Sequence, residues 1–80
     1  MKLLRLFHRI GCHLCEDMVE QLEPLRAEAD FECQLIDVDR DEGLLSRYHD
    51  RVPVLETEEG ELLCEVFLDP SSVLNYLQDV

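Results

Sequence analysis

Two cysteines separated by two residues stand where a strand-like segment gives way to a helix-like one. The segment Leu3–Phe7 is apolar enough for a central strand covered on both faces, and Gly11 after it favours a turn. Cys12 and Cys15 follow, at the predicted start of an amphipathic helix. Because thiols at this spacing can close a small disulfide, the segment can accept or donate two electrons. The pattern predicts a βαβ unit with a redox-active cysteine pair at its helix start.

The first helix is indicated by apolar residues that recur at the spacing of one helical face. They are Leu14, Met18, Leu22, Leu25 and Ala29. Pro24 lies inside this pattern and is expected to kink the helix or to end its first part. A second strand is predicted over residues 31–38, where apolar side chains alternate between two faces. One face holds Phe31, Cys33 and Leu35, and the other holds Ile36 and Val38.

The remaining segments predict a short helix, a hairpin and a last helix. Polar residues 39–41 favour a helix start, and Leu44 and Tyr48 mark the inner side of that helix. Segments 53–56 and 61–66 predict a hairpin, joined by an acidic turn that contains Gly60. The last helix is expected to begin with a cap, Asp69, and a proline, Pro70, and to face the core with Val73, Leu77 and Val80.

The predicted order of elements is βαβαββα. A helical crossover makes the first two strands parallel, and the hairpin adds antiparallel strands. The sequence therefore predicts an α/β fold, a mixed four-stranded sheet with helices on both faces. Eighty residues suffice for one small core, so we expect a single domain over residues 1–80.

Charge and apolar runs exclude several classes of function. Nineteen acidic and seven basic residues give a net charge of −12, which repels nucleic acid and anionic membranes. The same charge favours solubility and would steer basic protein partners. No apolar run approaches the roughly 18 residues of a membrane span, and Met1–Phe7 is too short for a signal-peptide core. We expect a cytoplasmic monomer that binds neither nucleic acid nor membrane.

The two cysteines of the pair are expected to have different roles. Unpaired backbone N–H groups at a helix start favour a thiolate, and cysteines in such motifs titrate well below the ordinary ~8.5. Cys12, nearer the turn, is the expected nucleophile, and Cys15, one turn into the helix, the resolving thiol. A protonated His13 would stabilise the thiolate, whereas the acidic side chains of Glu16 and Asp17 oppose it.

The other cysteines and histidines are not expected to take part. Cys33 and Cys64 fall on different predicted strands and are expected to behave as small hydrophobic residues, although an exposed Cys64 would be a candidate regulatory thiol. His8 and His49 are expected to be ordinary polar residues. We therefore predict no bound metal and no tightly bound cofactor.

Two alternative functions remain open from the residues alone. In the first, Cys12 and Cys15 supply two ligands to a metal or iron–sulfur centre, which a second chain or an added thiol completes. In the second, the chain is a binding or adaptor module with little turnover.

Several motifs together resemble the bacterial glutaredoxin-like proteins, a group related to glutaredoxin and thioredoxin. The matching runs are residues 11–16 around the cysteine pair, Asp37-Val38-Asp39, Arg47-Tyr48 and residues 51–55 around Val-Pro. The resemblance implies the thioredoxin fold, in which the first strand lies between the second and the third. Cys33 and Cys64 would then lie on opposite edge strands. It also implies a cis Val52-Pro53 bond beside the cysteine pair, with the backbone of Val52 available to an extended substrate.

The same resemblance implies a thiol–disulfide oxidoreductase that acts on protein disulfides or glutathione mixed disulfides. A separate dithiol reductase would restore the pair. Arg9 matches a position where glutaredoxins often hold a glutathione carboxylate, and Arg51 replaces the usual threonine before Val-Pro. The glycine pair that lets glutathione approach the backbone is absent, and acidic residues occupy the stretch 64–69. These departures argue against glutathione as the substrate.

Overall fold

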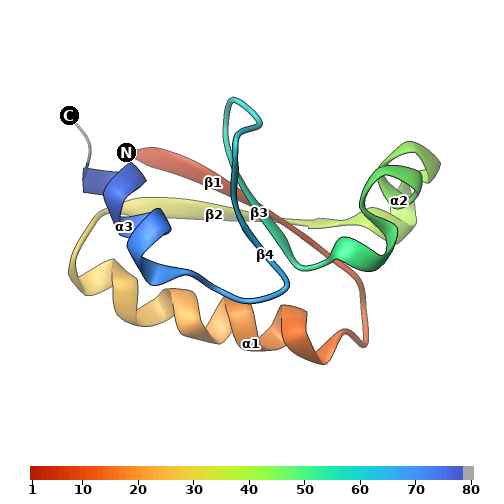
Figure 1. The fold of residues 1–80 in the computed structure, drawn as a ribbon, viewed down its shortest axis with the longest axis horizontal. Coiled ribbons are helices and arrows are strands. Elements are labelled where there is room, and N and C mark those ends of the chain that lie inside the picture. Colours follow the sequence, from red (N-terminus) through yellow and green to blue (C-terminus); the bar gives the residue numbers. More distant parts are fainter. Residues whose placement is uncertain (79–80) are drawn as a thin grey trace.

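A four-stranded sheet forms the centre of the computed structural model, which describes residues 1–78 (Figure 1). The strands lie in the order β2-β1-β3-β4; β1 pairs with β2 in parallel, and the other neighbours are antiparallel. This confirms the mixed sheet and the central position of the first strand. The strands are β1 Lys2–His8, β2 Phe31–Asp37, β3 Val54–Thr57 and β4 Leu62–Glu65.

Helices cover both faces of the sheet, as predicted. Helices α1 and α3 share one core with the sheet, and α2 packs against the opposite face near one end (Figure 1). Short 3-10 turns follow α1, β2 and α2 at residues 23–27, 38–40 and 49–51. The helices are α1 His13–Leu22, α2 Glu42–Tyr48 and α3 Pro70–Gln78. Among the described residues, none of these helices has the length and apolarity needed to cross a bilayer.

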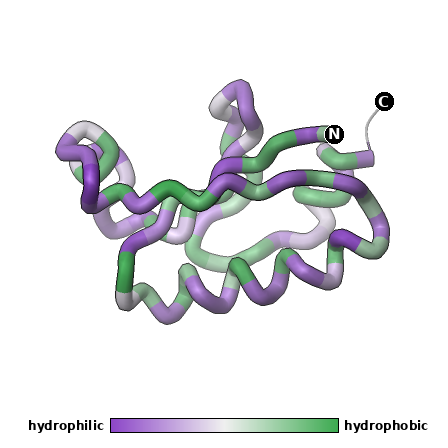
Figure 2. The backbone as a smooth tube through the Cα atoms, turned by 180° about the vertical axis from the view of Figure 1, so that it is seen from behind, coloured by the Kyte–Doolittle hydropathy of each residue, from purple (hydrophilic) through white to green (hydrophobic). Residues whose placement is uncertain are grey.

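The main core lies between the sheet and the pair α1 and α3. Leu4, Leu6 and Leu55 of the sheet are fully buried there, against Met18 of α1 and Val73 of α3. Hydrophobic and hydrophilic residues alternate along α1 in Figure 2, as expected of a helix with one face on a core. Leu77 also packs against this core, whereas the prediction for Val80 lies outside the described residues.

Helix α1 begins and ends where the sequence indicates, but its inner face is shifted. The first helix gives way to a 3-10 turn at Glu23, so Pro24 ends it. Cys15 and Met18 are buried, whereas Leu14 is 37% exposed, which corrects its prediction as a core residue. The buried residues follow the spacing 15, 18, 22 and 25, and this places Leu14 at the border of the apolar face.

A smaller core occupies the α2 face. The rings of Phe7 and Tyr48 stack with centroids 4.3 Å apart, and Val38 and Val54 complete the cluster. The Tyr48 hydroxyl donates a hydrogen bond of 2.8 Å to Glu56, whose carboxylate is buried. Because a buried carboxylate needs such a partner, this bond ties α2 to β3.

The second strand is one residue shorter than predicted, and one of its side chains faces a cavity instead of the core. Val38 begins a 3-10 turn directly after β2. Leu35 is 52% exposed, although Phe31 on the same predicted face is buried. Leu35 lies on an edge strand and lines a cavity beside α1, so no neighbouring element closes over it.

Candidate functional site

The cysteine pair lies at the start of α1, just beyond the carboxyl end of the central strand β1. Cys12 and Cys15 form a disulfide, with their Cα atoms 5.2 Å apart. Cys12 is the N-cap of the helix, in an extended conformation with φ −85° and ψ 105°. The preceding turn is possible because Gly11 has a φ of +83°, a conformation that costs glycine little. The turn and the cap together place the pair at the end of the sheet.

The two cysteine residues differ in their exposure to solvent. Cys12 is half-buried, whereas Cys15 is only 3% exposed and belongs to the inner face of α1. An incoming disulfide therefore meets Cys12 first. This is the order of access that the predicted roles of nucleophile and resolving thiol require.

Backbone donors at the helix start surround the Cys12 sulfur and carbonyl. The Cys15 N–H lies 3.2 Å from the Cys12 sulfur, and the Cys15 and Glu16 N–H groups donate to the Cys12 carbonyl at 3.1 Å. Donors of this kind and the positive end of the helix dipole favour negative charge on the Cys12 sulfur when the pair is reduced. The local structure therefore favours a thiolate at Cys12.

His13 points into solvent beside two carboxylates. Its side chain is 84% exposed, with Nδ1 at 3.9 Å from Glu16 and Nε2 at 3.7 Å from Asp17. A protonated His13 would thus share its charge with two carboxylates as well as with the Cys12 sulfur. Its effect on the thiolate remains a prediction.

The Val52-Pro53 bond is cis, as the resemblance implies. The register pairs Phe7 at the end of β1 with Val54 at the start of β3, so Pro53 lies at the same end of the sheet as the cysteine pair. The Pro53 carbonyl accepts a hydrogen bond of 2.7 Å from the Val66 N–H, directly after β4. This bond holds the proline segment against the chain between β4 and α3.

That chain turns sharply at Val66. Its φ is +68°, and the Phe67 N–H donates to the Glu65 carbonyl at 2.7 Å, which closes a three-residue γ-turn. A β-branched residue rarely adopts this conformation because its Cβ crowds the backbone. The turn leaves Phe67 69% exposed, next to a segment bonded to Pro53.

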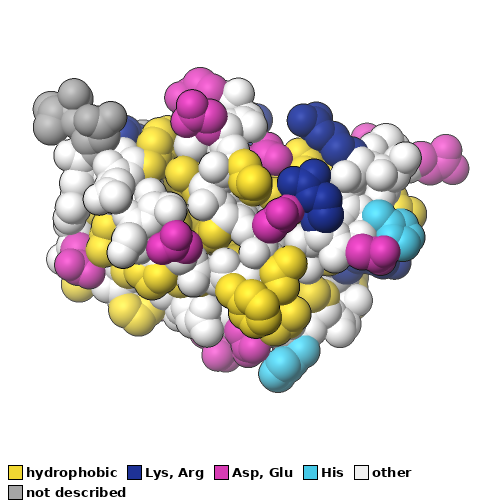
Figure 3. Space-filling view, viewed as in Figure 1, with side chains coloured by type: hydrophobic (Ala, Val, Ile, Leu, Met, Phe, Trp, Pro, Cys, Tyr) yellow, Lys and Arg dark blue, Asp and Glu magenta, His cyan; other side chains and the backbone are white. Residues whose placement is uncertain are grey.

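The surface near the helix start carries an apolar patch. Figure 3 shows hydrophobic side chains grouped over the N-terminal half of α1 and the segment between β4 and α3. The large exposed hydrophobic residues of these two segments are Leu14 and Phe67. Such a patch suits an apolar part of a larger molecule better than a small charged thiol.

The two arginines predicted to bind substrate already have partners in this chain. Arg9 lies 3.1 and 3.3 Å from the two carboxylate oxygens of Asp39, and Arg51 lies 2.7 Å from Glu65. The hydrogen bond to Glu65 is also the main reason why the pKa of Arg51 is raised. An anionic ligand at either guanidinium would have to displace a carboxylate of this chain.

The start of α3 is likewise occupied by the chain itself. Asp69 accepts hydrogen bonds from the Ser72 hydroxyl at 2.8 Å and the Ser72 N–H at 3.4 Å. These bonds, the hydroxyl first, lower the pKa of the Asp69 carboxyl. The carboxylate therefore takes the position that an external anion would occupy at a helix start.

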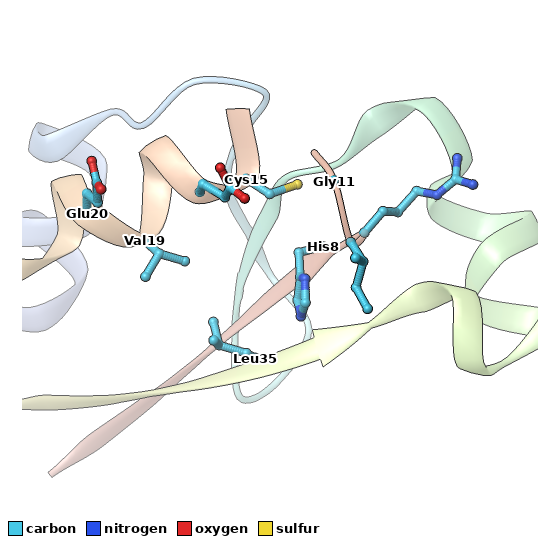
Figure 4. A pocket seen from close by; sticks show the side chains of 9 residues that line it. His8, Gly11, Cys15, Val19, Glu20 and Leu35 are labelled. Atoms are coloured by element: carbon cyan, nitrogen blue, oxygen red, sulfur yellow. The ribbon is translucent and has the colours of Figure 1, made fainter. Parts of the chain in front are cut away.

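A cavity of about 470 Å³ lies on the other side of β1 from the proline segment (Figure 4). Its walls include His8 at the end of β1, Cys15 and Val19 of α1, and Leu35 of β2. Sequence reasoning treated His8 as an ordinary polar residue. His8 is the last residue of the strand that leads to the cysteine pair, and this position in the sequence could have indicated that it lies near the cysteines.

The other two cysteines are free and lie apart. Cys33 and Cys64 occupy the edge strands β2 and β4, as predicted, with β1 and β3 between them. Cys64 is buried, which removes the condition for its predicted role as an exposed regulatory thiol. Burial raises the pKa of both thiols. Among residues 1–78, no three His, Cys, Asp or Glu side chains are grouped so that they could hold a metal ion.

Comparison with known proteins identifies the family. The family model described as Glutaredoxin-like domain (DUF836) matches residues 3–78. The chain is similar to protein Ne2328 from Nitrosomonas europaea, with 41% identity, a TM-score of 0.87, and coverage of 96% of this chain and 92% of that chain. An X-ray structure of a protein from X. campestris is 34% identical, with a TM-score of 0.73 and coverage of 96% and 97%.

A mutant thioredoxin from Halobacterium salinarum is also similar in structure. It is 28% identical, with a TM-score of 0.64 and coverage of 96% of this chain and 72% of that chain. The comparison with curated proteins finds no match. The cysteine pair at the helix start, the cis proline and these matches together show that the chain has the thioredoxin fold and belongs to the glutaredoxin-like domain family.

Proposed function

We propose that this protein is a small thiol–disulfide oxidoreductase that works through Cys12 and Cys15. The observation that carries the proposal is the disulfide at the start of α1, with one accessible and one buried sulfur. Helix-start donors make Cys12 the better nucleophile, and burial reserves Cys15 for the second step.

The reaction proceeds by two exchanges. The Cys12 thiolate attacks one sulfur of the substrate disulfide; a Cys12–substrate bond forms as the substrate bond breaks, and the leaving sulfur takes the electron pair and a proton. Cys15 then attacks Cys12, the Cys12–Cys15 bond forms, and the second substrate thiol leaves. The substrate gains two electrons from the pair, and a separate dithiol reductase supplies two further electrons that reduce the Cys12–Cys15 disulfide again.

We propose a protein disulfide as the substrate, in preference to a glutathione mixed disulfide. Arg9 and Arg51 are paired with carboxylates of the chain, and Asp69 caps α3, so the groups that would hold an anionic tripeptide are occupied. The exposed Phe67 and the backbone of Val52 instead suit an extended polypeptide. The negative net charge favours substrates with basic surfaces.

The redox chemistry of the pair also bears on where the protein works. A dithiol that must be reduced again after each turnover suits a cytoplasmic location, where thiol reductants are maintained. We propose that the protein acts there as a monomer without a tightly bound cofactor.

Replacement of Cys12 by serine tests the proposal. We expect Cys12→Ser to reduce the rate of disulfide reduction to that of the uncatalysed exchange, because the attacking thiolate is lost. Cys33→Ser is the matched control and should keep full activity, since Cys33 lies on an edge strand. Activity is measured on a protein disulfide and on a glutathione mixed disulfide, with faster reaction expected on the first. Full activity of Cys12→Ser would rule out the mechanism.

A further inference from the structure

The cavity beside α1 gives the buried Cys15 an outlet on the side away from the proline segment. It is bounded by α1, the end of β1, the following turn and β2, whereas Pro53 lies on the β3 side of β1. The cavity volume is about 470 Å³, far more than the roughly 10–15 Å³ that one water molecule needs. Cys15 therefore lines a space that is open to solvent, although this residue is only 3% exposed.

Cys15 must lose a proton before it can attack the mixed disulfide at Cys12. The thiolate is the nucleophile in thiol exchange, and apolar surroundings disfavour its formation. Met18 and Leu22 are the other buried residues of α1, and neither side chain accepts a proton. The cavity that Cys15 lines does contain side chains that can accept one.

His8 is the imidazole on the cavity wall. It is half-buried, and Figure 4 shows its side chain and the Cys15 sulfur on the walls of the same space, from the end of β1 and from α1. The other titratable side chains of the cavity are Glu16 and Glu20 of α1 and Arg9 after β1. Asp37 lies opposite His8 in the register of β2.

Imidazole suits this proton transfer better than the neighbouring groups. Imidazole is the side chain that can both accept and release a proton most readily near neutral pH. Carboxylic acids ordinarily titrate near 4, which makes carboxylates weaker acceptors, and an arginine remains protonated. A base with a pKa near the working pH is the most effective general base.

We propose that His8 accepts the proton of the Cys15 thiol, directly or through cavity water, when Cys15 resolves the mixed disulfide. The proton moves from Cys15 to His8, the Cys15 sulfur attacks Cys12, and the departing substrate sulfur takes the electron pair and then a proton. His8 then releases the proton to solvent through the cavity and can accept another in the next cycle. This inference rests on the oxidoreductase function proposed above.

A reaction with two kinetic phases tests the role of His8 independently of the proposed oxidoreductase function. The reduced protein is mixed with one equivalent of 5,5′-dithiobis(2-nitrobenzoate), and the released coloured thiolate is followed by stopped flow. The first phase reports attack by Cys12, and the second reports its displacement by Cys15. We expect His8→Gln to slow the second phase by about tenfold or more at pH 7 and to leave the first unchanged.

The pH profile tells a proton acceptor from a structural residue. In the wild type, the second phase should already rise with pH below the range in which a free thiol titrates, because His8 takes the proton of Cys15. In His8→Gln it should rise only toward the titration of a thiol, above about 8.5. If the variant does not fold, the wild-type profile decides: a second phase that rises only above about 8.5 overturns the inference.

His49→Gln is the matched control, because His49 is exposed at the end of α2 and lies 2.6 Å from Asp50. Both phases should be unchanged in this variant. An unchanged second phase in His8→Gln, or equal slowing in both histidine variants, overturns the role of His8. Absence of the first phase in the wild type would instead overturn the proposed oxidoreductase function.

Discussion

The molecule contains two pairs of cysteines, one that the fold brings together and one that it keeps apart. Cys12 and Cys15 meet at a helix start and form a disulfide. Cys33 and Cys64 lie on the two edge strands, with two strands between them. At about 4.8 Å per strand, these edges are about 14 Å apart, well beyond the 4.4–6.8 Å that Cα atoms of a disulfide allow.

The difference between the pairs comes from the backbone around the sulfur. At Cys12, the Cys15 N–H and the positive end of the helix dipole favour the thiolate. Cys33 and Cys64 lie on strands and contact apolar side chains of the main core, and burial raises the pKa of each thiol. We therefore expect the same residue type to be reactive at the helix start and unreactive in the sheet.

The largest expected effect is the trapping of a reaction intermediate, which distinguishes the Cys12–Cys15 pair from Cys33 and Cys64. In Cys15→Ser, Cys12 can still attack a substrate disulfide, but nothing in the pair displaces the product, so a stable mixed disulfide should accumulate and turnover should stop. Intact-mass spectrometry after one cycle would detect the added mass on Cys12.

Cys64→Ser is the control for this trap. It should complete the cycle and carry no adduct, since Cys64 is buried away from the pair. Accumulation of the same adduct in Cys64→Ser, or none in Cys15→Ser, would remove the distinction between the two pairs.

The next effect is the rate of alkylation of each thiol in the reduced protein. At pH 7 we expect iodoacetamide to modify Cys12 about 100-fold faster than Cys33 or Cys64, because only the thiolate reacts. The raised pKa values of Cys33 and Cys64 mean that their alkylation should increase only as the pH rises above the ordinary thiol range. Peptide mapping at several pH values measures each rate. Equal rates at pH 7 would contradict the proposed effect of the helix start.

The smallest expected effect concerns stability. Cys64 is part of the main core, so Cys64→Ser buries a hydroxyl among apolar side chains and should lower the free energy of unfolding by about 1–2 kcal/mol. Cys33 is only half-buried, and Cys33→Ser should cost less than half as much. Urea unfolding of the reduced proteins gives both values. A larger loss from Cys33→Ser would show that the edge at β2 is packed more tightly than its burial indicates.

Much of the fold was predictable because its signals are local. The cysteine cap, Pro24 and the turn at Gly60 each act through the backbone of a few neighbouring residues. The first helix begins and ends where predicted, and the predicted hairpin forms with each strand end displaced by one residue. The α/β order then restricts the sheet to a few topologies, of which the resemblance selected one.

The site was less predictable because its details depend on tertiary neighbours. The exposure of Leu14 and Leu35 depends on where α1 crosses the sheet edge, which periodicity does not specify. Arg9 pairs with a residue 30 positions away, so its unavailability to an anion is invisible in the local sequence. The cavity that brings His8 and Cys15 together also exists only once α1 lies against β2.

The turn at Val66 also has a consequence for the binding of small thiols next to the segment after β4. Its φ is positive, so the backbone after β4 has the shape that glycine adopts most readily, although a valine side chain covers it. The chain therefore has a backbone shape typical of glycine at a position that holds a valine. Val66→Gly would remove that side chain and leave a residue that adopts the same φ at little cost.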